Sequence, residues 1–137
     1  MTAADADAVA RLTGELGYPA TPDQIARRFA RIDGRPDQIV LVAEDGGAPI
    51  AWLHVAAHPY LESDATAEIL GLVVGEGRRS AGVGAALVAA AETWARRAGC
   101  RAMRVRSRIT RERAHAFYER AGFRRIKTQH AFEKPLG

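Results

Sequence analysis

Arg79, Gly82 and Gly84 form an Arg-x-x-Gly-x-Gly pattern between an apolar run and an alanine-rich run. Residues 69–74 have the composition of a strand, and the alanines after Gly84 have that of a helix start. The first N–H groups of a helix lack intrahelical partners and carry the positive end of the helix dipole, so they can bind a phosphate group. Glycine, which has no Cβ, lets a ligand approach the backbone closely. The pattern therefore predicts an anion-binding loop that suits a pyrophosphate.

Two other phosphate-binding motifs do not fit this loop. No Gly-Lys-Ser/Thr follows the glycines, so the loop is not the P-loop of nucleoside triphosphatases. No acidic residue ends a second strand, as a dinucleotide-binding fold requires. Because two glycines one residue apart also occur in ordinary turns, it is the flanking strand and helix that favour a ligand site.

Residues 74–84 resemble the acyl-CoA signature of the GNAT N-acetyltransferases, whose pattern is Arg/Gln-x-x-Gly-x-Gly/Ala. Residues 114–123, Ala-His-Ala-Phe-Tyr-Glu-Arg-Ala-Gly-Phe, resemble the second signature of the family, which ends in Tyr-Glu-x-x-Gly-Phe. The resemblance covers residues 3–134 and is to small bacterial members of the family. It implies an acetyl-CoA-dependent N-acetyltransferase.

The resemblance also implies which groups bind acetyl-CoA. Ser80 stands where the family more often has glycine, and Arg111 replaces an asparagine that often lies seven residues before the tyrosine. A main-chain N–H of Val74, or of Val73, is expected to hold the oxyanion, because family members carry a β-bulge there. The residues expected to bind the cofactor are Leu72, Val73, Val74, Arg78, Arg79, Ser80, Ala81, Gly82, Val83, Gly84 and Arg111.

Glu68 and Tyr118 are the expected catalytic residues. An alkylamine has a pKa of about 10.4, so forming the neutral nucleophile at pH 7 costs roughly 4 to 5 kcal/mol, and a base helps. Glu68 is the candidate base, and regular alternation would place it on the same strand face as Leu70, Leu72 and Val74. Many family members instead carry the acid at the position of Leu70. The alternative is therefore that Glu68 is a solvated residue at the start of the strand. By resemblance, Tyr118 protonates the departing thiolate; otherwise it is a core aromatic residue.

Length and composition favour one domain, residues 1–137, because a chain of this size is too short for two cores. No apolar run approaches the ~20 residues of a membrane span, and no secretory leader is evident, so a cytoplasmic protein is expected. Cys100, the single cysteine, excludes an internal disulfide. The four histidines lack metal-ligand spacing, so no metal is expected, although His54 and His130 could line an acceptor cleft.

The order of predicted elements favours the α/β class and the single-domain GNAT fold, with a mixed, mostly antiparallel sheet flanked by helices. Members of the family usually begin with a strand before the first helix, and the sequence shows none. Either the protein lacks this strand or the start of the sequence is clipped. In the helix after the loop, the apolar face is predicted to comprise Val83, Leu87, Ala90 and Trp94. The predicted helices are 5–16, 22–32, 83–98 and 111–121, and the predicted strands are 38–44, 49–57, 65–74, 102–106, 123–127 and 130–134.

The basic C-terminal part leaves more than one function open. Residues 96–127 hold eleven arginines and one lysine against Glu112 and Glu119, which a nucleic-acid surface or an acidic cofactor such as CoA would each explain. Nucleic acid is the less favoured partner. We expect acetyl transfer to a primary amine of a small antibiotic- or metabolite-type molecule, by direct attack in a ternary complex, and a homodimer. The alternatives are a protein or peptide acceptor and a non-catalytic acyl-CoA-binding module.

Overall fold

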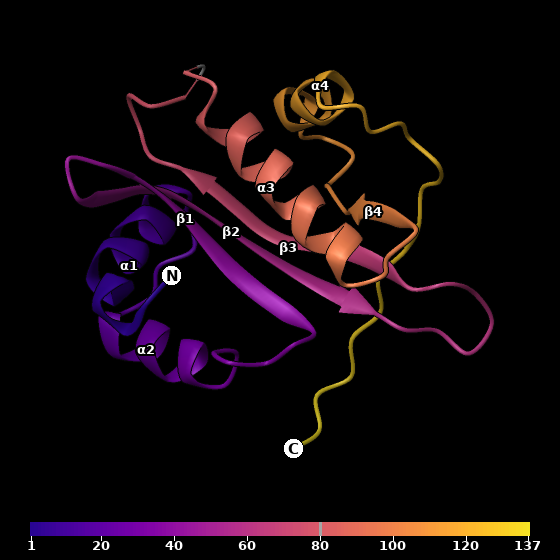
Figure 1. The fold of residues 1–137 in the computed structure, drawn as a ribbon, viewed down its shortest axis with the longest axis horizontal. Coiled ribbons are helices and arrows are strands. Elements are labelled where there is room, and N and C mark those ends of the chain that lie inside the picture. The colour runs from indigo at the N-terminus through magenta and orange to yellow at the C-terminus, as the bar shows by residue number, and fades with distance from the viewer. Residues whose placement is uncertain (80) are drawn as a thin grey trace. The chain divides into compact units, whose positions relative to one another are not determined.

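A four-stranded sheet, ordered β1-β2-β3-β4, forms the centre of the first of two units in the chain (Figure 1). The computed structural model describes residues 1–79 and 81–137, and the two units span Met1–Arg106 and Ser107–Gly137. The strands of the first unit are β1 (Gln38–Asp45), β2 (Ala48–His58), β3 (Thr66–Val74) and β4 (Ala102–Val105). Its helices are η1 (Ala3–Asp5), α1 (Ala6–Glu15), α2 (Pro22–Ala30) and α3 (Val83–Arg97), and the second unit holds α4 (Glu112–Arg120).

The sheet is mixed, as predicted. Strands β1, β2 and β3 run antiparallel in an up-and-down meander, whereas β3 and β4 run parallel. Gly46 and Gly47 make the first hairpin turn with φ of 61° and 81°, the positive values that a two-residue turn of type I′ requires. The parallel pair needs a crossover connection, and α3 provides it.

Capping residues set the start of α2, as the sequence predicts. The Thr21 hydroxyl accepts a hydrogen bond from the Gln24 amide at 3.1 Å, and the Gln24 side chain accepts one from the Thr21 amide at 3.0 Å. Pro22 follows at the first helical position, where its missing N–H costs nothing. This reciprocal capping box fixes where α2 begins.

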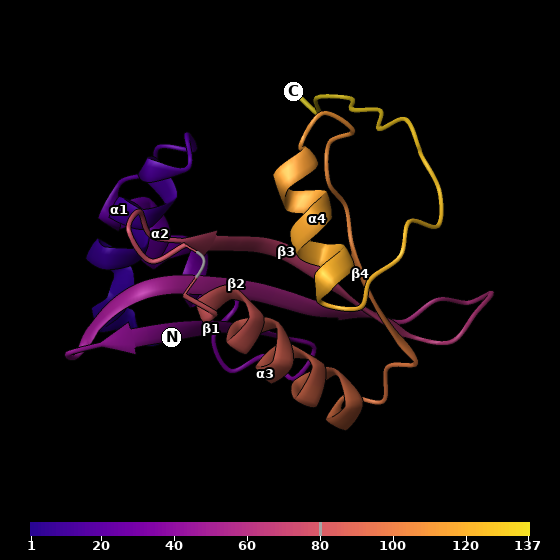
Figure 2. The ribbon, with the colours of Figure 1, turned by 90° about the horizontal axis from the view of Figure 1, so that it is seen from above.

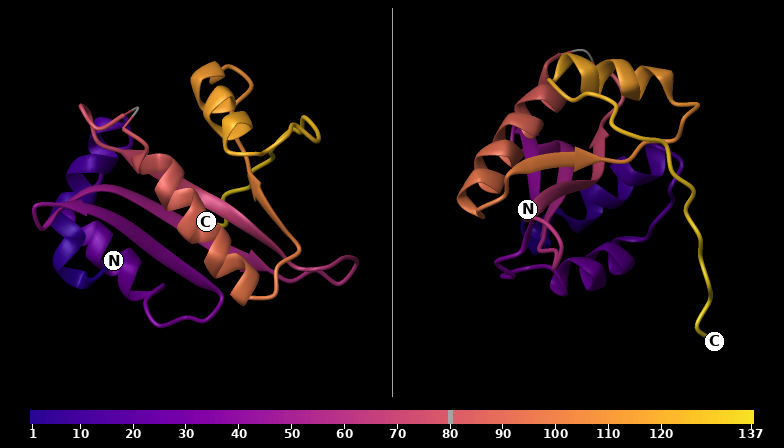
Figure 3. Two further views of the ribbon diagram at one scale, coloured as in Figure 1. Left: turned by 45° about the horizontal axis from the view of Figure 1, so that its top comes forward. Right: turned by 90° about the vertical axis from the view of Figure 1, so that its right-hand side faces the viewer.

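Helix α3 packs through its smallest side chains. Figure 2 shows α1 and α2 on one face of the sheet and α3 on the other, and Figure 3 shows α3 lying across the strands. The predicted apolar face is correct at Leu87 and wrong at Ala90, which is exposed. Glycine and alanine let the helix backbone lie close to the sheet, and this contact selects the buried stripe. The buried residues of α3 are Gly84, Leu87, Val88, Ala91 and Ala95.

Strand β3 carries a β-bulge at Leu70. Gly71 lies opposite His54 on β2, and Ile69 lies opposite Val55, so Leu70 is an extra residue without a partner on β2. The bulge was expected at Val73 or Val74, three to four residues later, and that expectation is wrong. An extra residue in one strand interrupts the alternation of side chains between the two faces.

The bulge therefore changes which residues share a face with Glu68. Glu68 lies on the same side of the sheet as Gly71 and Val73, because a one-residue insertion reverses the alternation beyond it. The prediction that Glu68 shares its face with Leu72 and Val74 is wrong for the same reason. Those two residues point to the opposite face.

Gly71 is a position where only glycine fits. A Cβ placed there would lie 2.7 Å from Cη2 of Trp52, whereas a Cβ at Gly14 in α1 would have nothing within 4 Å. We expect Gly71→Ala to lower the free energy of unfolding by about 1 to 3 kcal/mol through overpacking. Gly14→Ala, the matched control, should raise it by about 0.5 to 1 kcal/mol through its helix propensity. Urea denaturation measures both, and equal shifts in the two variants would contradict the close contact at Trp52.

The second unit consists of α4 and an irregular C-terminal segment. Gly122, with φ of 98°, ends the helix as predicted. Tyr118 makes edge-to-face contacts with Phe117 and Phe123, with ring centroids 5.2 and 5.6 Å apart. These three aromatic rings form the apolar cluster of this unit.

The predicted C-terminal hairpin is absent. Residues 123–137 form neither helix nor strand, and the side chains of Ile126 and Phe132 are 59% and 95% exposed. Two-residue hairpin turns favour glycine or asparagine, which readily adopt positive φ, and Thr128 and Gln129 are neither. A hairpin on its own is marginally stable in water, so alternation of apolar residues was not sufficient evidence for it.

Candidate functional site

The loop between β3 and α3 is anchored at its start. The Gly75 amide donates to the Ile50 carbonyl at 2.8 Å, and the Glu76 amide donates to the Glu15 carboxylate at 3.2 Å. A Cβ at Gly75 would lie 3.0 Å from both the Ile50 carbonyl oxygen and Cδ2 of Leu12. Only a glycine therefore fits between β2 and α1 without displacing a neighbour, and its position fixes where the loop leaves the sheet.

The loop ends in a helix start without a side-chain cap. Gly82 is the N-cap residue of α3 and has φ of 82°, in the left-handed region that favours glycine. The first amide that bonds back into the helix is that of Ala86, which donates to the Gly82 carbonyl at 3.0 Å. The amides of Val83, Gly84 and Ala85 lie in the preceding turn, where intrahelical acceptors do not exist. This turn has the geometry of an anion site.

The two loop arginines have different partners. Arg78 forms an ion pair with Asp45 at the end of β1, so its charge is partly neutralised. Arg79 instead lies back over the end of β3, with Nε 3.4 Å from the Val74 carbonyl oxygen. Ser80, a predicted cofactor-binding residue, lies outside the residues that the structure describes.

Beyond Ile69, one edge of β3 has no strand beside it in the described part of the chain. The parallel pairing with β4 covers Thr66–Ile69 and ends at the pair of Ile69 and Val105. From Gly71 to Val74, β3 pairs with β2 alone. The free edge offers main-chain N–H and C=O groups to an extended ligand, much as a sheet edge accepts an added strand. It includes the predicted residues Leu72, Val73 and Val74.

Glu68 is held by two neighbours from other parts of the first unit. Its Oε1 accepts hydrogen bonds from Nε and Nη2 of Arg106 at 3.0 and 2.8 Å. Its Oε2 lies 3.6 Å from Nε2 of His58. The Glu68 side chain is 14% exposed, so it is not the solvated strand-start residue considered from the sequence. One carboxylate oxygen is thus occupied by an arginine.

Tyr118 and Arg111, both predicted site residues, lie in the second unit. Burial raises the pKa of the Tyr118 phenol above its usual value near 10, and the positive charge of Arg111 opposes the shift. The phenol is therefore protonated at neutral pH and can donate a hydrogen bond or a proton. This state suits the predicted role of an acid.

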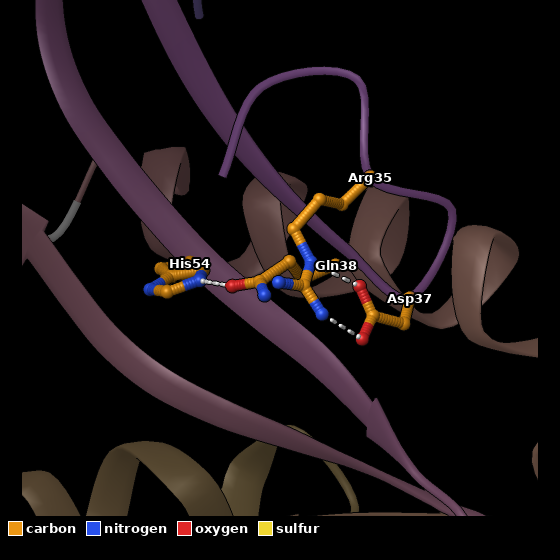
Figure 4. Close-up of polar contacts among 4 residues, drawn as sticks. All are labelled: Arg35, Asp37, Gln38 and His54. Atoms are coloured by element: carbon orange, nitrogen blue, oxygen red, sulfur yellow. Dashed lines mark hydrogen bonds and ion pairs between the residues drawn. The ribbon is translucent and has the colours of Figure 1, made fainter. Parts of the chain in front are cut away.

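His54 and Gln38 form a polar pair on the sheet face that also carries Glu68. Figure 4 shows the two side chains pointing toward one another, 2.8 Å apart between Nε2 of His54 and Oε1 of Gln38. The ion pair of Arg35 and Asp37 lies beside Gln38. Burial lowers the pKa of His54, so its ring is neutral at pH 7. No motif marks this pair, and counting strand positions outward from the hairpin turn would place Gln38 opposite Val55. The irregularity between Ala43 and Glu44 instead places Gln38 opposite Ala56, on the face of His54.

Residues 1–79 and 81–137 contain neither a metal-binding cluster nor a helix that could span a membrane. No group of three His, Cys, Asp or Glu side chains lies close enough together to hold a metal ion. No helix in this part of the chain combines the length and the hydropathy needed to cross a bilayer.

Comparison with known proteins places the chain in a family. Residues 7–123 match the model of the acetyltransferase (GNAT) family. An aminoglycoside N(6')-acetyltransferase type 1 from Klebsiella aerogenes is 31% identical over 116 residues, which cover 82% of this chain and 76% of that protein. A protein of the same name from Stenotrophomonas maltophilia is 30% identical over 139 residues, which cover 98% of this chain and 90% of the relative.

A solved structure agrees with the sequence relatives. AAC(6')-Iy in complex with the bisubstrate analogue CoA-S-monomethyl-acetylneamine superimposes with a TM-score of 0.87 at 19% identity, over 99% of this chain and 95% of that one. At this identity the likeness concerns the fold. The family match spans both signature regions, the loop before α3 and the tyrosine of α4. The chain therefore belongs to the GNAT family and is an acetyl-CoA-dependent N-acetyltransferase.

Proposed function

We propose that this enzyme acetylates a primary amine of a small polycationic molecule of the aminoglycoside type or a related metabolite. The main support is the pair of sequence relatives named aminoglycoside N(6')-acetyltransferases. Charge supports it as well, since residues 1–95 hold thirteen Asp and Glu against seven Arg. An acidic surface raises the local concentration of a cationic substrate and disfavours acidic ones.

Acetyl-CoA, which supplies the thioester carbonyl, is proposed to bind along the loop and the free edge of β3. The amides of Val83, Gly84 and Ala85 would donate to the pyrophosphate, and Arg79 would add a positive charge beside it. The pantetheine arm would accept main-chain hydrogen bonds from the stretch between Leu70 and Val74. The fit rests on the uncapped helix start and on the end of strand pairing at Ile69.

The proposed reaction is direct attack in a ternary complex. The amine nitrogen forms a bond to the carbonyl carbon, and the carbon–sulfur bond breaks. Although the bulge lies at Leu70, the oxyanion donor is still proposed at Val74 or Val73, because the edge of β3 is free of β4 there. This main-chain N–H holds the negative charge that develops on the carbonyl oxygen, a contribution of about 2.7 to 4 kcal/mol when preorganised. The protonated Tyr118 phenol gives a proton to the departing sulfur. Glu68 attracts the ammonium form of the acceptor and acts as a base or as its electrostatic partner.

Thiol release, followed with a dye, tests the acceptor class. We expect transfer to an aminoglycoside with a free 6'-amine and a kcat/KM at least about 100-fold lower for the matched compound with a hydroxyl at that position, since a hydroxyl is a far weaker nucleophile. A lysine peptide should react more slowly than the aminoglycoside. Preference for the peptide would favour a protein acceptor. Binding of acetyl-CoA with no thiol release from any amine would favour a non-catalytic module.

A further inference from the structure

We propose that His54 accepts the proton of the acceptor amine and that Gln38 holds its ring in the required tautomer. This inference rests on the proposed acetylation of an amine and identifies a residue for one of its steps. Four observations carry it: the place of His54 in the sheet, its protonation state, its hydrogen bond to Gln38, and the engagement of Glu68 by Arg106.

His54 lies at the level where the pairing of β3 with β4 has ended. Its partner on β3 is Gly71, the residue directly after the bulge at Leu70. The pairing of β3 with β4 ends at Ile69, on the other side of the bulge, so the free edge proposed for acetyl-CoA begins at the level of His54, on the far side of β3. His54 and Glu68 lie on one face, two strand positions apart if the bulge residue is not counted. A base is needed at this place, between the carboxylate and the thioester.

The protonation state of His54 suits a base. The ring is half-buried, and burial lowers its pKa, so the lone pair is available at neutral pH. A buried polar ring in the middle of a sheet costs free energy, and such residues are frequent at functional sites. A half-buried ring can still return a proton to water.

Gln38 decides which nitrogen accepts the proton. Oε1 of an amide only accepts hydrogen bonds, so Nε2 of His54 carries the hydrogen and the lone pair is on Nδ1. When Nδ1 takes a proton from the ammonium group, Nε2 still donates to Gln38, and no hydrogen bond has to be rearranged. The neutral amine then attacks, its second proton leaves with the thiol through Tyr118, and the imidazolium returns its proton to solvent. Across one turnover, one proton is released.

Glu68 complements this role. Its Oε1 already accepts two hydrogen bonds from Arg106, which hold the carboxylate and its charge in place. The carboxylate therefore holds the ammonium group, and His54 removes the proton. Other titratable groups near His54 are His58 on the same face and Asp37 and Arg35 beside Gln38. Helix α1, which packs against β2, carries Asp7, Arg11 and Glu15, all exposed to solvent.

His54→Gln should lower kcat/KM for the amine by roughly 30-fold at pH 7, below the usual range for a general base because Glu68 remains nearby. The defect should shrink to less than about threefold at pH 9.5, where about a tenth of the amine is neutral without a base, several hundred times more than at pH 7. The Kd of acetyl-CoA and the melting temperature should stay close to wild type. His58→Gln is the comparison on the same strand and face: its ring lies 3.6 Å from Oε2 of Glu68, so we expect a loss that is smaller than that of His54→Gln and the same at both pH values.

Gln38→Glu gives a second readout that a merely structural role would not move. A carboxylate hydrogen-bonded to Nε2 favours the imidazolium, so the acidic limb of the kcat/KM profile should shift to higher pH. An unchanged limb, a pH-independent defect in His54→Gln, or an equal loss in His58→Gln would each overturn the role of His54. If the wild-type enzyme acetylates no amine at all, the proposed function fails; if it does and His54→Gln is fully active at pH 7, only this inference fails.

Discussion

Replacing Tyr118 by Phe is expected to lower kcat by about 100- to 1000-fold, within the range for loss of a general acid. The phenol is protonated at neutral pH because burial raises its pKa. Phenylalanine keeps the ring, and with it the edge-to-face contacts to Phe117 and Phe123. Stability and the Kd of acetyl-CoA should therefore change little. Steady-state kinetics and calorimetric titration measure the two quantities separately.

The choice of leaving group sharpens this prediction. A thiolate of lower pKa needs less help from an acid, so the defect of Tyr118→Phe should shrink with an acetyl thioester of a more acidic thiol. Tyr60→Phe is the matched control, because that tyrosine is exposed and lies in the turn after β2; its kcat should change less than about twofold. Equal losses in kcat and in acetyl-CoA affinity would contradict the role of Tyr118 as an acid.

Ala85→Glu is expected to weaken acetyl-CoA binding by on the order of 1000-fold, or about 4 kcal/mol, and at the same time to stabilise the free enzyme. Ala85 is exposed in the first turn of α3. A carboxylate there interacts with the open amides and the helix dipole, which should add about 0.5 to 1 kcal/mol to the free energy of unfolding. The same carboxylate occupies the anion site and repels a pyrophosphate.

Ala90→Glu provides the control for this experiment. Ala90 is also exposed on α3 but lies more than one turn beyond the helix start, so the dipole and the open amides are out of its reach. Acetyl-CoA affinity and stability should both stay near wild type. Titration calorimetry gives the Kd, and urea denaturation gives the free energy of unfolding. If Ala85→Glu lost stability and affinity together, general damage to α3 would explain the result better than an anion site.

Local signals in the sequence predicted most of the fold. Thr21 and Gln24 specify the start of α2 through their own side chains, and Gly46-Gly47 specifies the first hairpin through backbone conformation. The pattern Arg79-x-x-Gly82-x-Gly84 predicted a helix start, and α3 begins at Val83. Each of these features is encoded within a few residues, so neither packing nor distant contacts had to be known.

Features that depend on distant contacts could not be predicted in this way. No residue type marks the bulge at Leu70, yet it decides that Glu68 shares a face with Gly71 rather than with Leu72. The partners of Glu68 and of Arg78 lie 38 and 33 positions away in the chain. For residues 123–134 the local pattern itself was misleading. Alternating apolar residues predicted two strands, but this part of the chain provides neither a suitable turn nor enough apolar surface to stabilise them.

A crystal structure of the enzyme with acetyl-CoA tests the anion site most directly. The pyrophosphate oxygens should lie about 3 Å from the main-chain nitrogens of Val83, Gly84 and Ala85, with the thioester beside the free edge of β3 between Leu70 and Val74. A pyrophosphate bound elsewhere, with those nitrogens bonded to the protein's own groups, would contradict both the cofactor site and the mechanism built on it.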